Sequence, residues 1–432
     1  MKKIVFYHEN TCVAEIDFSR PWLGNPGVGG TEYLFMVLIY YLQSYLKNHS
    51  LDRDYQFILL TSEITKLPEG TIAYSVKSGE EAISKTKQLN ADIFVAQPPF
   101  YDSSSFKTWQ SMQFYADSGI KFIAWSHGFL QNSTLDPLHT NNNFKAFVCV
   151  GHEQLDSNIY HSIYDKSTFI FNIFESELAQ PIPLEKRSIC DVVYLGSLMD
   201  AKGFHVLAEA WPKVLKKVPN ARLKVIGSGK LYDRNNFLGR YGIASEDYEK
   251  RFMPFLTDDK GAIIPSVEFF GTMGTEKYEV IKKAAVGVAN PTSWTECCPA
   301  SALDIQACGV PVVAGNKLGL LDTVEHGKTG IGVKDVDTLS AALIELLNNP
   351  EQRSRMGVAG PSFVRHKFNK EATCEKWIEL FETVLSGRPI GSIRPRPKSQ
   401  FWRDKKIFRH GNWYLRKLKA FFRSIARLFS RK

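Results

Sequence analysis

The sequence predicts an α/β protein built from two doubly wound domains. Short apolar runs of four or five residues alternate with helical patterns, and the alternation occurs in two successive blocks. Runs that are apolar on both faces are typical of parallel strands covered by helices on each side. Ligands of such sheets bind beyond the carboxyl ends of the strands, so polar residues that directly follow a strand are the first candidates for a site.

The predicted strands define the domain boundaries. The first block has strands at 3–7, 55–61, 92–96, 121–125, 146–150 and 167–171. The second block has strands at 191–195, 222–226, 266–270, 286–289 and 311–314. A helix is predicted over 204–217, where apolar residues recur on one face. We therefore expect domains at 1–173 and 191–367, with a proline-containing linker at 174–190.

The bulk composition supports two ordinary domains and gives no sign of a membrane span. The chain has 432 residues, 44% of them hydrophobic, which is enough for two buried cores. The longest apolar run, 33–42, is about half the length that crosses a bilayer. The apolar start at 4–7 is too short for a signal peptide, so we expect a cytoplasmic protein. The seven cysteines lack the paired spacing of a zinc site and are interpreted as small buried hydrophobes.

The positive charge is concentrated at the carboxyl terminus. The net charge is +9, but residues 388–432 contain 15 Lys or Arg and one Asp, which leaves the remaining chain at −5. Apolar and basic side chains alternate there at helical spacing, and the residues expected to contact lipid are Leu415, Lys419, Phe422, Arg423, Ile425 and Arg427. This pattern predicts that 387–432 associates with an anionic membrane surface. A solvated tail, a nucleic-acid arm and a helix docked on the protein's own acidic body are the alternatives, and the apolar stripe argues against the first two.

The stretch 290–311 is the strongest candidate site. A predicted strand ends near Asn290, a loop carries Glu296, and Pro299 suits the first turn of a helix. The backbone N–H groups between Cys298 and Ala302 would be unpaired there and could bind a diphosphate. Asp304 lies two turns further on and could face the same cleft. The alternative is that both acids are solvated surface groups.

This stretch resembles glycosyltransferase family 4. The matching residues are Ser293, Glu296, Ala302, Leu303, Ala307, Gly309, Pro311, Val312 and Val313, whereas Asp304 stands where the family has a second glutamate. The resemblance implies the GT-B fold, in which two Rossmann-like domains face a central cleft, and a helix at 368–386 that returns to the first domain. It also implies a nucleotide-sugar donor, retention of anomeric configuration, Glu296 near the donor sugar and Asp304 at the ribose.

The second domain carries two further parts of the resemblance. The loop 196–203 is similar to the family's phosphate-binding loop, with Lys202 in place and Ser197 where an arginine is expected. We consider Lys230 as a replacement for that arginine. Gly271 follows the strand expected beside the nucleotide base. The stretch 230–266 is longer than the family leads us to expect and is interpreted as a lid or an interaction element.

The first domain contributes a glycine-rich loop and a histidine. Gly29 and Gly30 precede an apolar helix, where the absence of side chains lets the backbone approach a ligand closely. The loop resembles the family's donor-facing and acceptor-facing loop. His127 follows a predicted strand and matches the family's active-site histidine, although a lone histidine is more often structural. Glu153 lies in a region where the family places acceptor-side polar groups.

No metal site or cofactor is expected. Asp335 and Asp337 form a D-x-D pattern, but they precede a helical segment, and we interpret Asp337 as its N-cap. The nucleotide-diphosphate sugar is a co-substrate. The candidate catalytic residues are His127 and Glu296, and the candidate donor-binding residues are Gly29, Gly30, Lys202, Gly271, Cys298, Pro299, Ala300, Ser301 and Asp304.

These observations lead to one expected function and two alternatives. We expect transfer of a sugar from the nucleotide donor to a glycan or lipid-linked acceptor at the cytoplasmic face of a membrane, in polysaccharide or glycolipid synthesis. The same frame also suits a sugar epimerase or phosphorylase. Because Ser197 and Asp304 depart from the family pattern, a non-catalytic protein that binds nucleotide sugars and regulates a partner is the second alternative. The donor sugar, base, acceptor and oligomeric state stay open.

Overall fold

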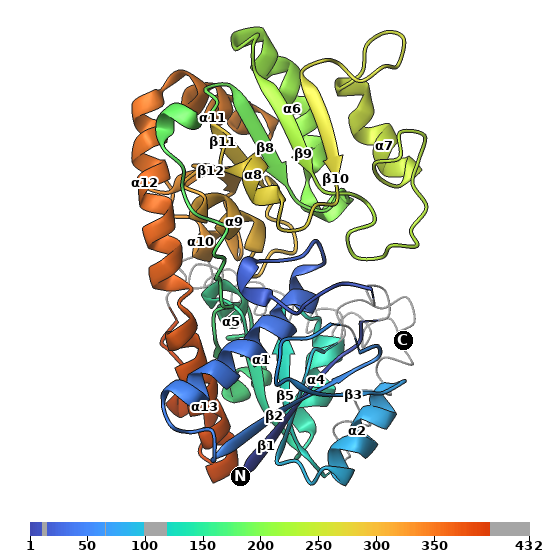
Figure 1. The fold of residues 1–432 in the computed structure, drawn as a ribbon, viewed down its shortest axis with the longest axis vertical. Helices are drawn as coiled ribbons and strands as arrows, with labels where there is room; N and C mark the ends of the chain where they lie inside the picture. The colour runs from blue at the N-terminus through green and yellow to red at the C-terminus, as the bar shows by residue number, and fades with distance from the viewer. Residues whose placement is uncertain (11–14, 65, 99–118, 398–432) are drawn as a thin grey trace, which may run out of the picture.

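Two parallel sheets, each covered by helices, form the body of the protein (Figure 1). The computed structural model describes residues 1–10, 15–64, 66–98 and 119–397. Within them, one sheet has seven strands in the order β3-β2-β1-β4-β5-β6-β7, and the other has six in the order β10-β9-β8-β11-β12-β13. In both, the chain winds outward from a central strand in two directions, as the alternation of apolar runs and helical patterns predicts.

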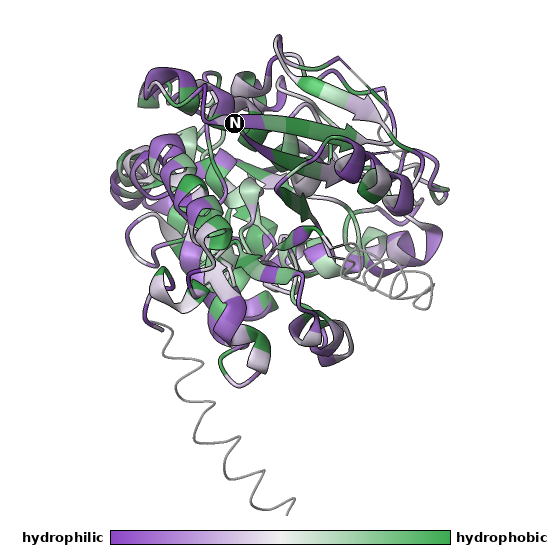
Figure 2. Cartoon of the chain, turned by 90° about the horizontal axis from the view of Figure 1, so that it is seen from below, coloured by the Kyte–Doolittle hydropathy of each residue, from purple (hydrophilic) through white to green (hydrophobic). Residues whose placement is uncertain are grey.

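The first sheet is buried because its strands are apolar on both faces. Its strands are β1 Lys2–His8, β2 Tyr55–Thr61, β3 Ile72–Ser75, β4 Ile93–Ala96, β5 Lys121–Ser126, β6 Phe144–Cys149 and β7 Ser167–Phe169. The central strand β1 pairs in parallel with β2 and β4, so that Phe6 lies opposite Leu59 on one side and Val95 on the other. Figure 2 shows these strands in the interior, between helices with hydrophilic outer faces.

The second sheet repeats the design. Its strands are β8 Asp191–Leu195, β9 Arg222–Ile226, β10 Val267–Gly271, β11 Val286–Ala289, β12 Val312–Gly315 and β13 Gly330–Val333. On one face, α6 packs against α11 over a core that includes Trp211 and Leu343, both fully buried. Trp211 fits there because its indole N–H donates to Ser266 Oγ at 3.1 Å, which satisfies its one polar group.

Helices connect the strands in both domains. Those of the first domain are α1 Gly30–Asn48, α2 Gly79–Gln88, α4 Asn132–Thr140 and α5 His152–Ser157. Those of the second domain are α6 Phe204–Lys217, α7 Glu246–Phe252, α8 Lys277–Ile281, α9 Ala300–Ala307, α10 Leu320–Thr323, α11 Val336–Asn348 and α12 Pro350–Lys367. The last α-helix of the described residues, α13 Lys370–Ser386, follows α12 directly.

The helix α13 packs on the first domain, although it follows the second domain in sequence (Figure 1). Its Trp377 ring centre lies 5.2 Å from that of Trp125 in β5 and 6.2 Å from that of Phe6 in β1. Both tryptophans are almost completely buried. Aromatic contacts of this kind contribute about 0.5–1.5 kcal/mol beyond the area they bury, so α13 is held firmly on the first domain.

Three local expectations differ from the structure. The edge strands β3 and β13 are not predicted, because β3 is half exposed and β13 contains two glycines. The interpretation of Asp337 as the N-cap of α11 is wrong. Asp335 is the cap, accepting a hydrogen bond from the Thr338 N–H, whereas Asp337 is exposed and pairs with Lys213 at 2.6 Å.

The predicted membrane-contacting residues of the tail lie outside the described part of the chain. Within the part that the structure describes, no helix combines the length and the apolar character needed to cross a bilayer. The membrane association of the tail therefore stays a prediction.

Candidate functional site

A cavity of about 200 Å³ lies between the two domains, where the carboxyl ends of both sheets face each other. Residues that follow strands line it from both sides: His127 after β5, Ser197 after β8, Gly227 after β9, Thr272 after β10 and Asn290 after β11. This is the position at which doubly wound sheets bind ligands. Residues from sequence motifs that are far apart along the chain therefore meet at this cavity.

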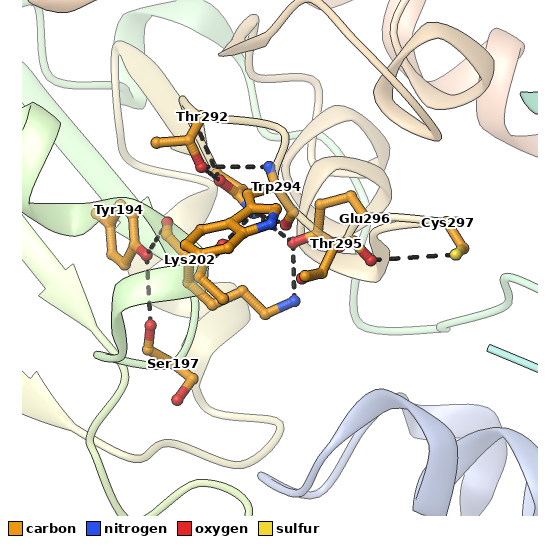
Figure 3. Close-up of polar contacts among 10 residues, drawn as sticks. Tyr194, Ser197, Lys202, Thr292, Trp294, Thr295, Glu296 and Cys297 are labelled. Carbon is orange, nitrogen blue, oxygen red and sulfur yellow. Dashed lines mark hydrogen bonds and ion pairs between the residues drawn. The ribbon is translucent and has the colours of Figure 1, made fainter. Parts of the chain in front are cut away.

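A buried ion pair occupies the second-domain wall. Lys202 Nζ lies 2.8 Å from Glu296 Oε1, and the two side chains are 19% and 9% exposed (Figure 3). Burial alone lowers the pKa of the Lys202 ammonium, but the charge of Glu296 outweighs this effect and raises the net pKa above its ordinary value. Lys202 is therefore fully charged at neutral pH, and an anionic ligand would compete with Glu296 for it.

The loop that carries Glu296 is organised by Asn290. The Asn290 amide donates to Glu296 Oε1 at 2.8 Å and to the backbone oxygens of Ala201 and Trp294. Its carbonyl oxygen accepts from the Thr292 hydroxyl. Figure 3 shows the loop around the ion pair. Asn290 thereby fixes the carboxylate of Glu296 and ties its loop to the loop that carries Lys202.

Three non-glycine residues of this loop have positive φ: Asn290, at 20°, and two in the left-handed region. Ser293 has φ of 62° and Thr295 has φ of 64°. Such conformations cost of order 1 kcal/mol or more for residues with a Cβ, and most of all for a β-branched residue. They persist here because the Ser293 hydroxyl accepts from the Lys317 N–H and Asn290 holds the rest of the loop. The loop therefore presents Glu296 in one fixed orientation.

The amino end of α9 faces the same cavity. Cys298, Pro299, Ala300 and Ser301 line it, and the N-cap residue, Pro299, makes no side-chain hydrogen bond to the helix. The first backbone N–H groups of a helix lack partners within it and carry a partial positive charge. Together with the nearby Lys202, they form a suitable site for a diphosphate.

A second buried ion pair lines the same cavity. Asp304 of α9 accepts from the Tyr278 hydroxyl at 2.7 Å and lies 3.5 Å from Lys277 Nζ. Burial raises the pKa of Asp304 above its ordinary value, against the opposing effect of Lys277. Lys277 Nζ also donates to the backbone oxygen of Asn25 at 3.1 Å, which belongs to the first domain. This pair therefore connects the two domains across the cleft.

The glycine-rich loop of the first domain approaches the second domain closely. A Cβ on Gly24 would lie 2.3 Å from the Tyr278 hydroxyl, and one on Gly27 would lie 2.9 Å from the Met273 carbonyl oxygen. Both glycines have positive φ, so they fit these contacts in shape and in backbone conformation. Arg234, from the long stretch 230–266, donates to the Gly27 carbonyl oxygen. That stretch therefore contacts the loop over the cleft.

His127 lines the cavity as a neutral imidazole. Burial lowers its pKa to about 3, and the neighbouring His8 contributes in the same direction. Neither of its ring nitrogens is in full hydrogen-bond geometry with a described residue, although the Asn172 side chain is near enough to oppose the lowering of the pKa. Unpaired buried polar atoms are costly, and at a cavity they indicate positions where a ligand can make the missing bonds. His127 can donate to a ligand hydroxyl from one nitrogen and accept at the other.

The structure brings most of the predicted site residues together, but not all. Gly30, His127, Ser197, Lys202, Glu296, Asp304 and residues 298–301 line the cavity. Gly29 is set behind it, against Glu32 and Tyr232. Gly271, Lys230 and Glu153 are not among the lining residues. Glu153 is buried in α5, where its backbone N–H donates to Asp322 Oδ2 of the second domain.

Three important residues of the cavity region escaped the sequence analysis. Lys277 and Asn290 line the cavity, and Tyr278 binds Asp304. Their side chains act through partners distant in sequence, and no local motif marks Lys277 or Tyr278. The one available signal was the position of Asn290 at a predicted strand end. Within the described ranges, no group of three or more His, Cys, Asp or Glu side chains is arranged to hold a metal ion.

Comparison with known proteins finds relatives of part of the chain and of its fold. Residues 190–349 match the family model of glycosyl transferases group 1. The chain is 31% identical over 194 residues to a GDP-mannose-dependent monoacylated α-(1-6)-phosphatidylinositol monomannoside mannosyltransferase of Corynebacterium glutamicum, covering 43% of this chain and 45% of the relative. It is 25% identical over 199 residues to the capsular polysaccharide biosynthesis glycosyltransferase CapM of Staphylococcus aureus, covering 44% and 46%.

Solved structures match over a greater length. A sucrose-phosphate synthase from Thermosynechococcus elongatus has a TM-score of 0.65 at 15% identity and covers 90% of this chain and 100% of its own. HepE of Anabaena, solved in complex with UDP, has a TM-score of 0.62 at 12% identity, with 89% and 100% covered. The predicted GT-B fold of the two domains is thereby confirmed.

The relatives found by sequence cover a smaller share of the chain than the similar structures do. The chain spans about half the length of the curated relatives it matches. The resemblance to glycosyltransferase family 4 is confirmed, and the family-model match lies in the second domain, which carries both ion pairs.

Proposed function

We propose that the protein is a glycosyltransferase that moves a sugar from a nucleotide-diphosphate sugar to a glycan or lipid-linked acceptor. The observation that carries the proposal is the buried Lys202–Glu296 pair beside the amino end of α9. Breaking the bond between the anomeric carbon and the phosphate oxygen leaves negative charge on the diphosphate and positive character on the sugar. In the cavity, Lys202 and the helix N–H groups can stabilise the negative diphosphate, and the Glu296 carboxylate can stabilise the positive sugar.

Donor binding should rearrange the Lys202–Glu296 pair. The diphosphate takes the Lys202 ammonium, and Glu296 remains held by the Asn290 amide with an oxygen available to the donor sugar. Positive charge then lies under the leaving group and negative charge under the sugar. The acceptor hydroxyl attacks the anomeric carbon, the diphosphate leaves with the electrons of the broken bond, and its departing oxygen takes up the proton of the acceptor hydroxyl. Retention of anomeric configuration is expected from the family resemblance. Independence from metals is expected because Lys202 and the α9 N–H groups can neutralise the diphosphate.

The departure at Ser197 leaves the diphosphate with less positive charge than the family provides. Ser197 lines the cavity, but its hydroxyl donates to the Ser228 carbonyl oxygen. Lys230 does not line the cavity, whereas Lys277 does. We therefore assign the second positive charge of the cleft to Lys277 and withdraw Lys230 from that role. The relatives named as a GDP-mannose-dependent phosphatidylinositol monomannoside mannosyltransferase and a capsular polysaccharide biosynthesis glycosyltransferase suggest a glycolipid or polysaccharide acceptor.

Two experiments test the proposed reaction. Calorimetric titration with UDP, GDP, ADP and CMP identifies the base, and one nucleoside diphosphate should bind at least about tenfold more tightly than the others. A panel of sugars on that nucleotide is then tested for transfer with an acceptor present and for release of nucleoside diphosphate without it. Nucleotide binding without release or transfer from any donor would favour the non-catalytic alternative. Interconversion of the free donor sugar would favour an epimerase.

The membrane part of the proposal rests on the basic segment 388–432. Deleting this segment changes the net charge from +9 to −5 and leaves the cavity residues in place. The truncated chain should still bind nucleotide but lose flotation with anionic vesicles, because the cations and the apolar stripe are gone. Equal flotation of the two proteins would show that this segment is not the anchor.

A further inference from the structure

A basic pocket lies on the first domain at the edge opposite the cleft. It has a volume of about 450 Å³ and is lined by Lys121, Lys145, Lys166 and Arg388 together with a single acid, Asp165. Lys121 opens β5, Lys145 lies near the start of β6 and Lys166 directly precedes β7. These three strands are neighbours in the parallel sheet, so their amino ends bring three lysines to one place.

The cations of this pocket bind only neutral partners among the described residues. Lys121 Nζ donates to the Leu385 carbonyl oxygen at 3.3 Å, and Lys145 Nζ donates to that of Asn142 at 2.5 Å. Lys166 Nζ donates to two carbonyl oxygens at the end of α4, at 3.0 and 3.2 Å. In the described ranges, no carboxylate lies within ion-pair distance of these lysines or of Arg388.

Each of these groups retains donors for a ligand. An ammonium has three N–H donors and a guanidinium has five, so every cation of the pocket has at least one left after its bonds to the protein. Burial lowers the pKa of Lys166, and the charge of Lys145 contributes to the same shift. Like charges held together at a partly desolvated site repel one another, and an anion placed among them removes that cost.

We propose that this pocket binds a phosphate group, either on a lipid headgroup or on a soluble phosphate ester. The cations come from four separate chain segments and converge on one opening, as suits an anion with several acceptor oxygens. The pocket also lies where the basic segment begins: Arg388 is part of its wall, and Arg394 stacks on Tyr164 with 4.0 Å between the guanidinium carbon and the ring centre. This site is separate from the donor cavity and does not depend on the proposed transferase activity.

The test compares two double variants of the full chain that lose the same charge. Lys121→Gln/Lys145→Gln removes two cations from the pocket, and Lys216→Gln/Lys217→Gln removes two exposed cations from the end of α6 in the second domain. Flotation is measured with vesicles of phosphatidylglycerol in phosphatidylcholine. The pocket variant should bind about 25-fold more weakly than wild type, roughly fivefold for each lysine near an anionic surface. The α6 variant should bind as wild type does.

Two further measurements exclude misfolding and identify the source of the phosphate. Lys121→Arg/Lys145→Arg should restore vesicle binding, because arginine keeps the charge and binds phosphate well. Glycerol 3-phosphate is then titrated while the acetylation rates of Lys121 and Lys145 are followed by mass spectrometry. Protection by glycerol 3-phosphate indicates a site for phosphate esters in general, and protection by the vesicles alone indicates a lipid site.

The proposal is overturned if neither glycerol 3-phosphate nor the anionic vesicles slow the acetylation of Lys121 and Lys145. Equal flotation of the pocket and α6 variants, together with protection by glycerol 3-phosphate, would assign the site to soluble phosphate esters. Release of nucleoside diphosphate from the donor is measured in parallel without vesicles. It should be unchanged in the pocket variant, so a failure of the phosphate site is distinguishable from a failure of the proposed function.

Discussion

The two lysine–carboxylate pairs of the cleft contain the same chemical groups but are held differently. Lys202 and Glu296 both come from loops of the second domain, lie 2.8 Å apart and are fixed by Asn290. Lys277 and Asp304 come from two helices, lie 3.5 Å apart and are connected through Lys277 to the first domain. The first pair depends on one domain alone, whereas the second depends on how the two domains are placed. The first pair is therefore suited to the chemistry, and the second to holding the two domains together beside the donor.

The largest expected effect is at the first pair. Lys202→Ala and Glu296→Gln should each lower kcat by at least about 10²-fold, because each removes a positioned charge that stabilises the transition state. Lys213→Ala is the matched control, since Lys213 forms a comparably short pair with Asp337 on the exposed surface of the same domain. Initial rates of the purified variants measure the effect, and melting temperatures confirm that they fold. A rate for Lys202→Ala equal to that of the control would remove Lys202 from the site.

The second pair should affect donor binding more than the chemical step. Asp304→Ala should weaken donor binding by about 1.5–3 kcal/mol, the range for a hydrogen bond to a charged group. Asp304→Glu should retain or improve affinity, because the longer side chain has the reach of the family's glutamate. Calorimetry with the preferred nucleoside diphosphate measures both. If both variants bind as wild type does, Asp304 does not contact the donor, and the second pair has only a structural role.

The pH dependence of stability below pH 6.5 should report on the two buried histidines near the lysine–carboxylate pairs. His8 and His127 have pKa values lowered by burial to about 4 and about 3, below the ordinary value of 6.5. The unfolded chain therefore binds more protons below pH 6.5, and stability falls as the pH decreases from 6.5 toward 4. Each histidine contributes a slope of up to about 1.4 kcal/mol per pH unit. In urea unfolding, His127→Asn should show a shallower slope than wild type. An unchanged slope would mean that the imidazole is not buried in the neutral form.

The smallest expected effect is that of metal removal. If Lys202 and the α9 N–H groups neutralise the departing diphosphate, treatment with EDTA should leave the initial rate within about twofold of the untreated value. Activity abolished by EDTA and restored by magnesium or manganese would contradict this mechanism. The lysine–carboxylate pairs would then need a different explanation.

The sequence identifies the parts of the site that lie within local motifs. Lys202 and Glu296 follow strands, in patterns that resemble a known family, and both line the cavity. Lys277 and Tyr278 carry no such pattern, because their importance comes from contacts with Asp304 and with the first domain. Asn290 was visible as a strand end, but its bonds to two loops depend on the folded arrangement.

The same distinction holds for the fold. Central strands such as β1 and β11 are predicted because burial on both faces requires an apolar run. The strands β3 and β13 lack such a run, because the second half of β3 is exposed and β13 contains two glycines, so their sequences are less informative. Lys230 illustrates the converse case. Its sequence position after a strand suggests a site, but its side chain is not among those that line the cavity.

The left-handed residues of the Glu296 loop limit how far this protein can be made heat-resistant without loss of activity. Thr295→Gly would relieve an unfavourable backbone conformation in the folded state, but it would also give the unfolded chain more freedom. Any gain in melting temperature would come with a looser loop and a less fixed Glu296. In this loop, selection for thermal stability and selection for catalytic turnover therefore favour different residues. A screen for thermostable variants should leave 290–296 unchanged.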